Sequence, residues 1–141
     1  APARAPRLLG RPADEMIAGI TATGLVGSSA EAALLHFRGA FHDPFMYAPI
    51  ALPPVAAGLL ADATRRPRRS RWLARQWLRL IAALGFLGMG FHAYGIHRNM
   101  GGWRNWRQNL LAGPPLPAPP AFTGLALAGL AALSLMEARR G

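Results

Sequence analysis

Four apolar stretches, separated by short polar or proline-rich connections, divide this chain. They cover residues 16–37, 46–63, 78–97 and 121–137. A helix needs about 20 residues, within a range of about 17–25, to cross the hydrocarbon core of a bilayer. The first three stretches meet this length, whereas the last, with its apolar part at residues 122–136, is short for it. The pattern predicts an all-α protein, an integral membrane four-helix bundle.

The region before the first stretch has a different composition. Residues 1–13 hold three prolines, three arginines and no periodic apolar pattern. We therefore expect a basic cytoplasmic tail that is mobile or bound to a partner. Asp14 is expected to cap the N-terminus of the first helix. The rest of the chain, residues 14–141, predicts one transmembrane domain, because the connections are too short for a separate soluble domain.

The arginines are distributed unequally over the connections. Twelve flank one end of the apolar stretches and four flank the other. The twelve are Arg4, Arg7, Arg11, Arg65, Arg66, Arg68, Arg69, Arg71, Arg75, Arg79, Arg139 and Arg140, and the four are Arg38, Arg98, Arg104 and Arg107. Cytoplasmic loops of membrane proteins carry the Lys/Arg excess, so both termini are expected in the cytoplasm. The absence of lysine and the abundance of Ala, Gly, Pro and Arg favour a GC-rich bacterial genome, and hence the bacterial inner membrane.

Three connecting segments predict contact surfaces. The arginine-rich loop of residues 65–71 is expected to contact anionic lipids. After the third stretch, Trp103, Trp106 and Leu110 recur at spacings of three and four residues, which predicts a short helix lying in the outer membrane interface. The strap of residues 114–120 contains five prolines and cannot be helical throughout. We expect the outer helix and the strap to contact other membrane subunits.

Two spans carry residues that shape helix packing. The first contains Gly19, Gly24 and Gly27, and such small residues let helix backbones approach closely inside a membrane, so this face is expected to pack on another helix. The second contains Pro53 and Pro54, which remove backbone donors and predict a kink in its outer half.

The composition also excludes several classes of function. A net charge of +10 and a pI near 11.9 would suit nucleic acid. The arginines flank apolar spans, however, and only 16% of residues are charged, so no nucleic-acid partner is expected. The chain has no cysteine, which excludes disulfides and cysteine-ligated clusters. Without a paired nucleophile and base, a nucleotide loop or a metalloprotease motif, we expect no enzyme.

Four ionisable side chains lie inside or at the outer ends of the apolar stretches: Glu31, His36, His92 and His97. Ionisable groups within a membrane are costly and are functional candidates by default. Counting about 1.5 Å per residue from the outer helix ends places Glu31 level with His92 and His36 level with His97. The four would form two cross-helix pairs if the first and third helices were neighbours.

Helical spacing limits what these residues can bind together. Within each helix the two candidates are five residues apart, which rotates them by about 140°, so one metal centre shared by all four is not expected. One histidine from each of two helices can ligate haem b, and Gly85 and Gly88 would leave room for a flat ring beside His92. The Gly88-x-x-x-His92 spacing is similar to that of histidines that ligate bacteriochlorophyll in antenna helices. Histidines that only bond water, headgroups or carbonyls explain the same residues.

Together these patterns predict a small non-catalytic accessory or anchor subunit of a larger membrane complex, one that handles electrons or quinones on the outer side. Two alternatives stay open. The first is an electron-transfer anchor that binds haem b, bacteriochlorophyll or quinone through His92 with His36 or His97. The second is a four-helix, proton-coupled transporter that uses Glu31, although this residue lies nearer the outer end than a central binding acid should.

Overall fold

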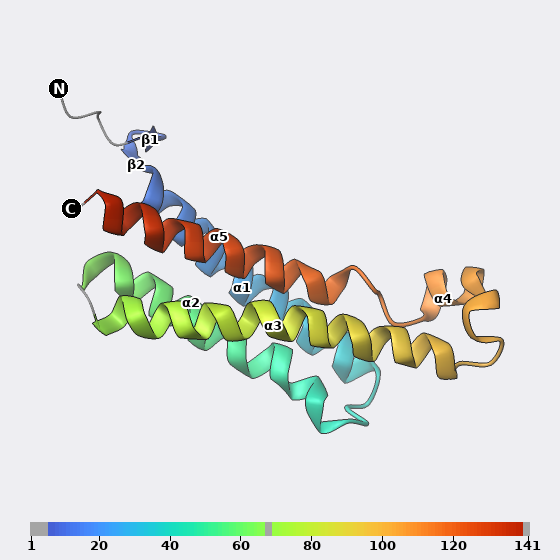
Figure 1. The fold of residues 1–141 in the computed structure, drawn as a ribbon. Coiled ribbons are helices and arrows are strands. Elements are labelled where there is room, and N and C mark those ends of the chain that lie inside the picture. The colour runs from blue at the N-terminus through green and yellow to red at the C-terminus, as the bar shows by residue number, and fades with distance from the viewer. Residues whose placement is uncertain (1–5, 67–68, 140–141) are drawn as a thin grey trace.

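Four long helices form the body of the protein in its computed structural model, which describes residues 6–66 and 69–139 (Figure 1). They are α1 (Ala13–Arg38), α2 (Ala48–Arg65), α3 (Arg69–Arg98) and α5 (Ala118–Ala138). Each is long and apolar enough to cross a membrane. The predicted helical, four-span architecture is confirmed at this level.

Short elements join the helices or precede them. The strands β1 (Arg7–Leu8) and β2 (Arg11–Pro12) pair antiparallel before α1. A 3-10 turn, η1 (Pro44–Tyr47), leads into α2, and a second one, η2 (Gly102–Arg104), precedes the short helix α4 (Trp106–Ala112). The helix predicted between the third and fourth spans is therefore present.

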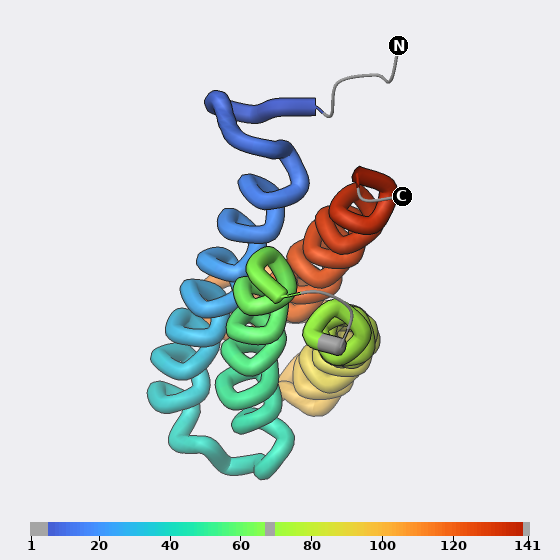
Figure 2. Tube along the Cα trace, turned by 90° about the vertical axis from the view of Figure 1, so that its left-hand side faces the viewer, coloured from blue at the N-terminus to red at the C-terminus, as the bar shows by residue number. Residues whose placement is uncertain are grey.

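The two ends of the bundle differ in what they hold. The terminal end contains the β1–β2 hairpin, the end of α2, the beginning of α3 and the end of α5, and the α4 end lies opposite (Figure 1). Within the bundle, α1 and α3 each pack against both α2 and α5. α1 and α3 therefore lie on a diagonal, with α2 between them in Figure 2. The condition for the predicted cross-helix pairs, neighbouring first and third helices, is not met.

The interior is built from small side chains between a few large ones. Leu25, Leu60, Leu78 and Leu133 are fully buried, one from each long helix. Glycines allow the closest approaches, because a Cβ atom at Gly24 would lie 2.7 Å from Leu125 Cδ2. Small residues at helix interfaces are the usual means of dense packing where lipid replaces water.

A side chain of α1 compensates for a proline in α2. The helix continues through Pro53 and Pro54. Pro53 has no N–H to donate to the carbonyl of Pro49, one turn earlier. Ser29 Oγ donates to that carbonyl instead, at 2.9 Å. The freed backbone acceptor is thus satisfied by the neighbouring helix, which also fixes the register of α1 against α2.

Residues 7–12 of the expected basic tail form a two-stranded hairpin, closed by Leu9 and Gly10 at φ of 49° and 78°. Two successive residues with positive φ fit the twist of paired strands. That the tail is mobile or bound to a partner stays a prediction.

Two local predictions are wrong. Asp14 is not a cap, because α1 begins one residue earlier and no side chain caps it. The last helix is not short: with 21 residues it begins at Ala118, since prolines in a first turn cost no helical hydrogen bond.

Candidate functional site

Two of the four predicted site residues lie within electrostatic range of each other at the α4 end. These are His36, near the end of α1, and His92, two turns before the end of α3. His42, on the connection after α1, also lies within electrostatic range of His36. The depth count placed His36 level with His97, whereas the α3 histidine within electrostatic range of His36 is His92. α3 runs further out than α1, so equal distances from the two helix ends are not equal depths.

The strap orients His92. Its Nδ1 atom lies 2.8 Å from the carbonyl oxygen of Pro115. A carbonyl can only accept, so Nδ1 carries the proton and donates, which leaves the Nε2 lone pair open. Histidines that bind metals are oriented in this way, by a backbone carbonyl on the other ring nitrogen. The strap therefore presents His92 in a ligand-competent tautomer.

His36 has a different environment. Its Nδ1 atom is buried and has no hydrogen-bond partner among the described residues. The ring lies next to the backbone of Met46 and edge-on to Phe41, with 6.5 Å between ring centroids. A buried nitrogen without a partner costs free energy. Among the four candidates, His36 is the one with a buried polar atom that lacks a hydrogen-bond partner in the described part of the chain.

The space expected for a flat ring beside His92 is filled by α5. A Cβ atom at Gly88 would lie 2.9 Å from Pro119 Cβ, and one at Gly85 would lie 2.8 Å from the carbonyl oxygen of Pro119 and would collide with Thr123 Oγ1. Thr123 also donates to the carbonyl of Ala82, at 2.8 Å. These glycines serve to bring α3 and α5 together. The prediction that Gly85 and Gly88 leave room for a flat ring is wrong, because α5 begins at Ala118 and fills this space.

The remaining two candidates do not join this site. Glu31 is exposed on α1 and His97 is exposed near the end of α3. Glu31 does not contact His92, because their helices are diagonal and His92 bonds the strap. The part of the chain that the structure describes holds no group of three or more His, Asp or Glu residues arranged to bind a metal ion. The orientation of Glu31, away from the bundle axis, also removes support for a proton path through the interior.

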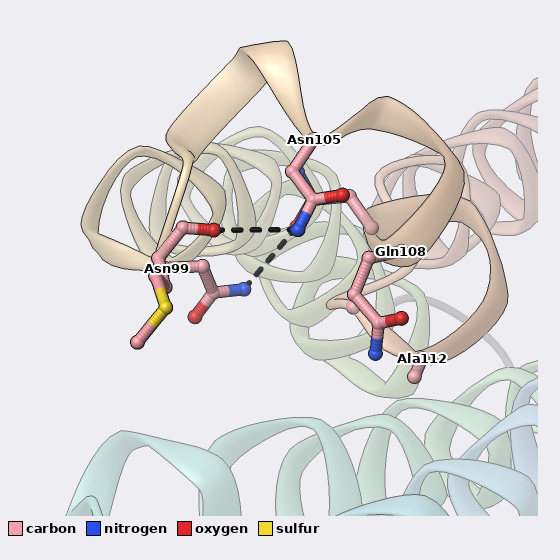
Figure 3. Close-up of a pocket in the computed structure, with 7 residues that line it drawn as sticks. Asn99, Asn105, Gln108 and Ala112 are labelled. Carbon is pink, nitrogen blue, oxygen red and sulfur yellow. Dashed lines mark hydrogen bonds between the residues drawn. The ribbon is translucent and has the colours of Figure 1, made fainter.

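An amide-lined hollow that sequence reasoning missed lies at the tip of the α4 end. It has a volume of about 390 Å³ and its lining includes Asn99, Asn105, Gln108 and Asn109 (Figure 3). Asn109 donates to the carbonyl of Gly102 at 2.8 Å, and Asn99 donates to Asn109 Oδ1 at 3.3 Å. These bonds hold the turn between α3 and α4. The Asn and Gln content of residues 99–109 was the available signal for it.

The outer face of this tip is apolar and uncovered. Met100, Leu110 and Leu111 are 94%, 80% and 84% exposed, and Trp106 is 63% exposed. Arg107 stacks over the Trp106 ring at 5.9 Å. α4 itself makes its main contacts with the adjacent η2. The short helix thus presents large apolar side chains that the bundle does not use.

The terminal end is held by ion pairs of this chain. Arg139 lies 3.0 Å from the buried carboxylate of Asp14 and 3.0 Å from Glu15. Arg75 contacts Glu137 at 2.9 Å. Arg71, expected at the lipid headgroups, is buried and lies near the carbonyl of Ala63, because α3 turns it towards the end of α2. Pro67 and Arg68 of the same loop lie outside the described residues.

Comparisons of this chain with protein-family models, with curated proteins and with solved structures find no match.

Proposed function

We propose that this chain is a small, non-catalytic accessory or anchor subunit of a larger membrane complex that transfers electrons or handles quinones. The supporting observation is the apolar outer face of the α4 end, where Met100, Leu110 and Leu111 are almost fully exposed. Large apolar patches on a protein surface mark sites of contact with proteins or membranes. In this proposal the patch anchors a partner subunit.

The proposed orientation follows from the arginines. The terminal end lies in the cytoplasm and the α4 end outside, in the inner membrane of a bacterium. Trp106 and Arg107 then lie at the outer interface, where aromatic and basic side chains favour the headgroup region. A partner bound there would be held against the membrane surface.

Purification in mild detergent from the native membrane tests the anchor role. Replacing Leu110 and Leu111 together by serine is expected to lower the yield of co-purified partner subunits at least several-fold, because the docking surface becomes polar. A matched control is Leu127→Ser, since Leu127 is exposed on α5 within a span. Equal yields with the double variant and the unaltered chain would remove the patch as an anchor, and the absence of any partner with the unaltered chain would overturn the proposed function.

A second function, haem b or quinone binding by the chain itself, is favoured by the position of His36 and His92 within electrostatic range of each other at the α4 end. The donated bond from His92 to Pro115 leaves Nε2 free for an iron or a proton donor. The side of α3 that carries Gly88 is filled by α5. His36 and His92 are the two histidines that would hold a bis-histidine haem.

Spectroscopy of the purified chain and of its parent complex tests the ligand. A Soret band that is lost in both His36→Ala and His92→Ala, but kept in His97→Ala, would support haem at this pair. The exposed His97 is the matched control. No Soret band in either preparation, together with no quinone in a solvent extract, would leave the two histidines with a structural role.

A further inference from the structure

The face of α1 that points away from the bundle carries one row of exposed residues. Gly19, Thr23, Gly27 and Glu31 are spaced four apart and are all exposed. Residues four apart lie on one face of a helix. α2 and α5 pack on the other faces of α1. This row is therefore available to another molecule.

Glu31 is the unusual member of this row. Among the described residues it has no ion-pair or hydrogen-bond partner, whereas Thr23 Oγ1 is satisfied by the carbonyl of Gly19 at 3.0 Å. The nearest basic residue along the same face is Arg38, seven residues further and about 10 Å away along the axis. The carboxylate of Glu31 thus has no partner within the part of the chain described.

The surroundings of Glu31 are apolar towards the α4 end. Leu34 and Leu35, on the next turn of the same face, are 53% and 41% exposed, and Phe37, further out, is 70% exposed. Hydrocarbon that covers Phe37 also covers Glu31, which lies deeper. Ionisable residues in membranes almost always face protein or water and pair there with another group. A carboxylate that faces lipid without a partner is therefore energetically unfavourable.

The glycines of the row do not identify a partner by themselves. Gly58 on α2 and Gly124 on α5 also face open space. Asp62 lies one turn from Gly58 but pairs with Arg66, and no acidic residue shares the exposed face of Gly124. What distinguishes the α1 row is an acidic residue without a partner among the described residues. Small residues let a second helix approach closely, and Glu31 then determines which chemistry that helix must carry.

We propose that this face of α1 docks a transmembrane helix of a partner subunit, and that an Arg or Lys side chain of that helix pairs with Glu31. A second copy of this chain in a parallel dimer would place one Glu31 against another, and like charges in a low dielectric repel. The inference rests on the proposed function as an accessory subunit and adds the position and charge of one contact.

Photo-crosslinking identifies the partner helix first. A photoreactive residue replaces the exposed Ala30 in the full chain, and the native membranes are illuminated before purification. The expected product is a transmembrane peptide of another subunit with an Arg or Lys level with Glu31. Crosslinks only to lipid, to a second copy of this chain, or to a helix without a basic residue would overturn the proposal.

Charge reversal then tests the pair itself. Glu31→Arg is expected to lower the yield of co-purified partner about tenfold, and replacing the partner's basic residue by Glu is expected to restore it. Glu31→Gln keeps the shape and is expected to lose about threefold, as hydrogen bonding remains. Helical content and thermal unfolding of each variant in detergent verify that this exposed position leaves the fold intact.

A matched pair of glycine variants separates docking from general damage. Gly27→Ile is expected to reduce partner yield, whereas Gly124→Ile, on an open face without a charge, is expected to leave it unchanged. If the α4 variants release the partner but Glu31→Arg does not, this inference fails and the accessory role stands. If nothing co-purifies with the unaltered chain, both fail together.

Discussion

The two ends of the bundle satisfy their polar groups in different ways. At the terminal end, Arg139 joins α5 to Asp14 and Glu15 of α1, and Arg75 joins α3 to Glu137 of α5. At the α4 end the described residues form no ion pair, and the contacts include hydrogen bonds of neutral side chains, as from Asn99 to Asn109, and aromatic stacking, as between Phe41 and Tyr47. The chain closes its terminal end by itself and leaves the α4 end open to other molecules.

The largest effect is expected at the terminal end. Arg139→Ala leaves Asp14 buried and unpaired, and removing one partner of a buried ion pair costs about 3–5 kcal/mol. Because Arg139 is itself partly exposed, we expect about 3 kcal/mol in the free energy of unfolding, measured by denaturant titration in detergent. Arg66→Ala removes an exposed pair with Asp62 and is expected to cost less than about 1 kcal/mol. Equal losses of unfolding free energy for the two variants would contradict the conclusion that the buried ion pair of Arg139 holds the terminal end.

The seam between α3 and α5 tests how far dense packing extends towards the α4 end. Gly85→Ala puts a methyl group against Thr123 and Pro119 and is expected to cost about 1–3 kcal/mol through overpacking. Gly90→Ala, five residues further along α3, faces open space and is expected to be neutral or slightly stabilising. Thermal unfolding of both variants measures the difference. A tolerated Gly85→Ala would mean that the seam is looser than the structure shows.

A smaller effect is expected from a hydrogen bond near the α4 end. Ser29→Ala removes the donor to the Pro49 carbonyl and leaves that partly buried acceptor unsatisfied, at a cost of about 1–2 kcal/mol. Ser134→Ala is the matched control, because its hydroxyl bonds the carbonyl of Leu130 in its own helix and is exposed. Denaturant titration compares the two variants. If Ser134→Ala costs as much, the bond between helices has no special role.

The smallest effect on stability is expected where the surface is most apolar. Serine at both Leu110 and Leu111 is expected to change the free energy of unfolding by less than about 0.5 kcal/mol, since these side chains contact nothing that holds the bundle. The same double variant is expected to release partner subunits. A large loss of stability in the isolated chain would show that α4 packs on the bundle. It would contradict the conclusion that the α4 end is open.

Much of the architecture follows from local patterns in the sequence. The length of an apolar stretch decides whether a helix spans a bilayer, and the spacing of Trp103, Trp106 and Leu110 was enough to predict α4. The last span was underestimated because Pro119 and Pro120 were assigned to the strap that precedes the helix, whereas they occupy its first turn. The hairpin before α1 depends on backbone angles at Leu9 and Gly10 that residue composition does not encode.

The candidate site depended on tertiary structure instead. Spacing showed that Glu31 and His36 point in different directions on one helix, and so excluded a single shared site. It could not show which direction faces the interior, because this depends on the order of helices around the bundle. With α1 and α3 on a diagonal, His36 is partly buried within electrostatic range of His92, and Glu31 is exposed. Sequence alone determined the spans and the available chemistry, and only packing decided which groups meet and which remain for a partner.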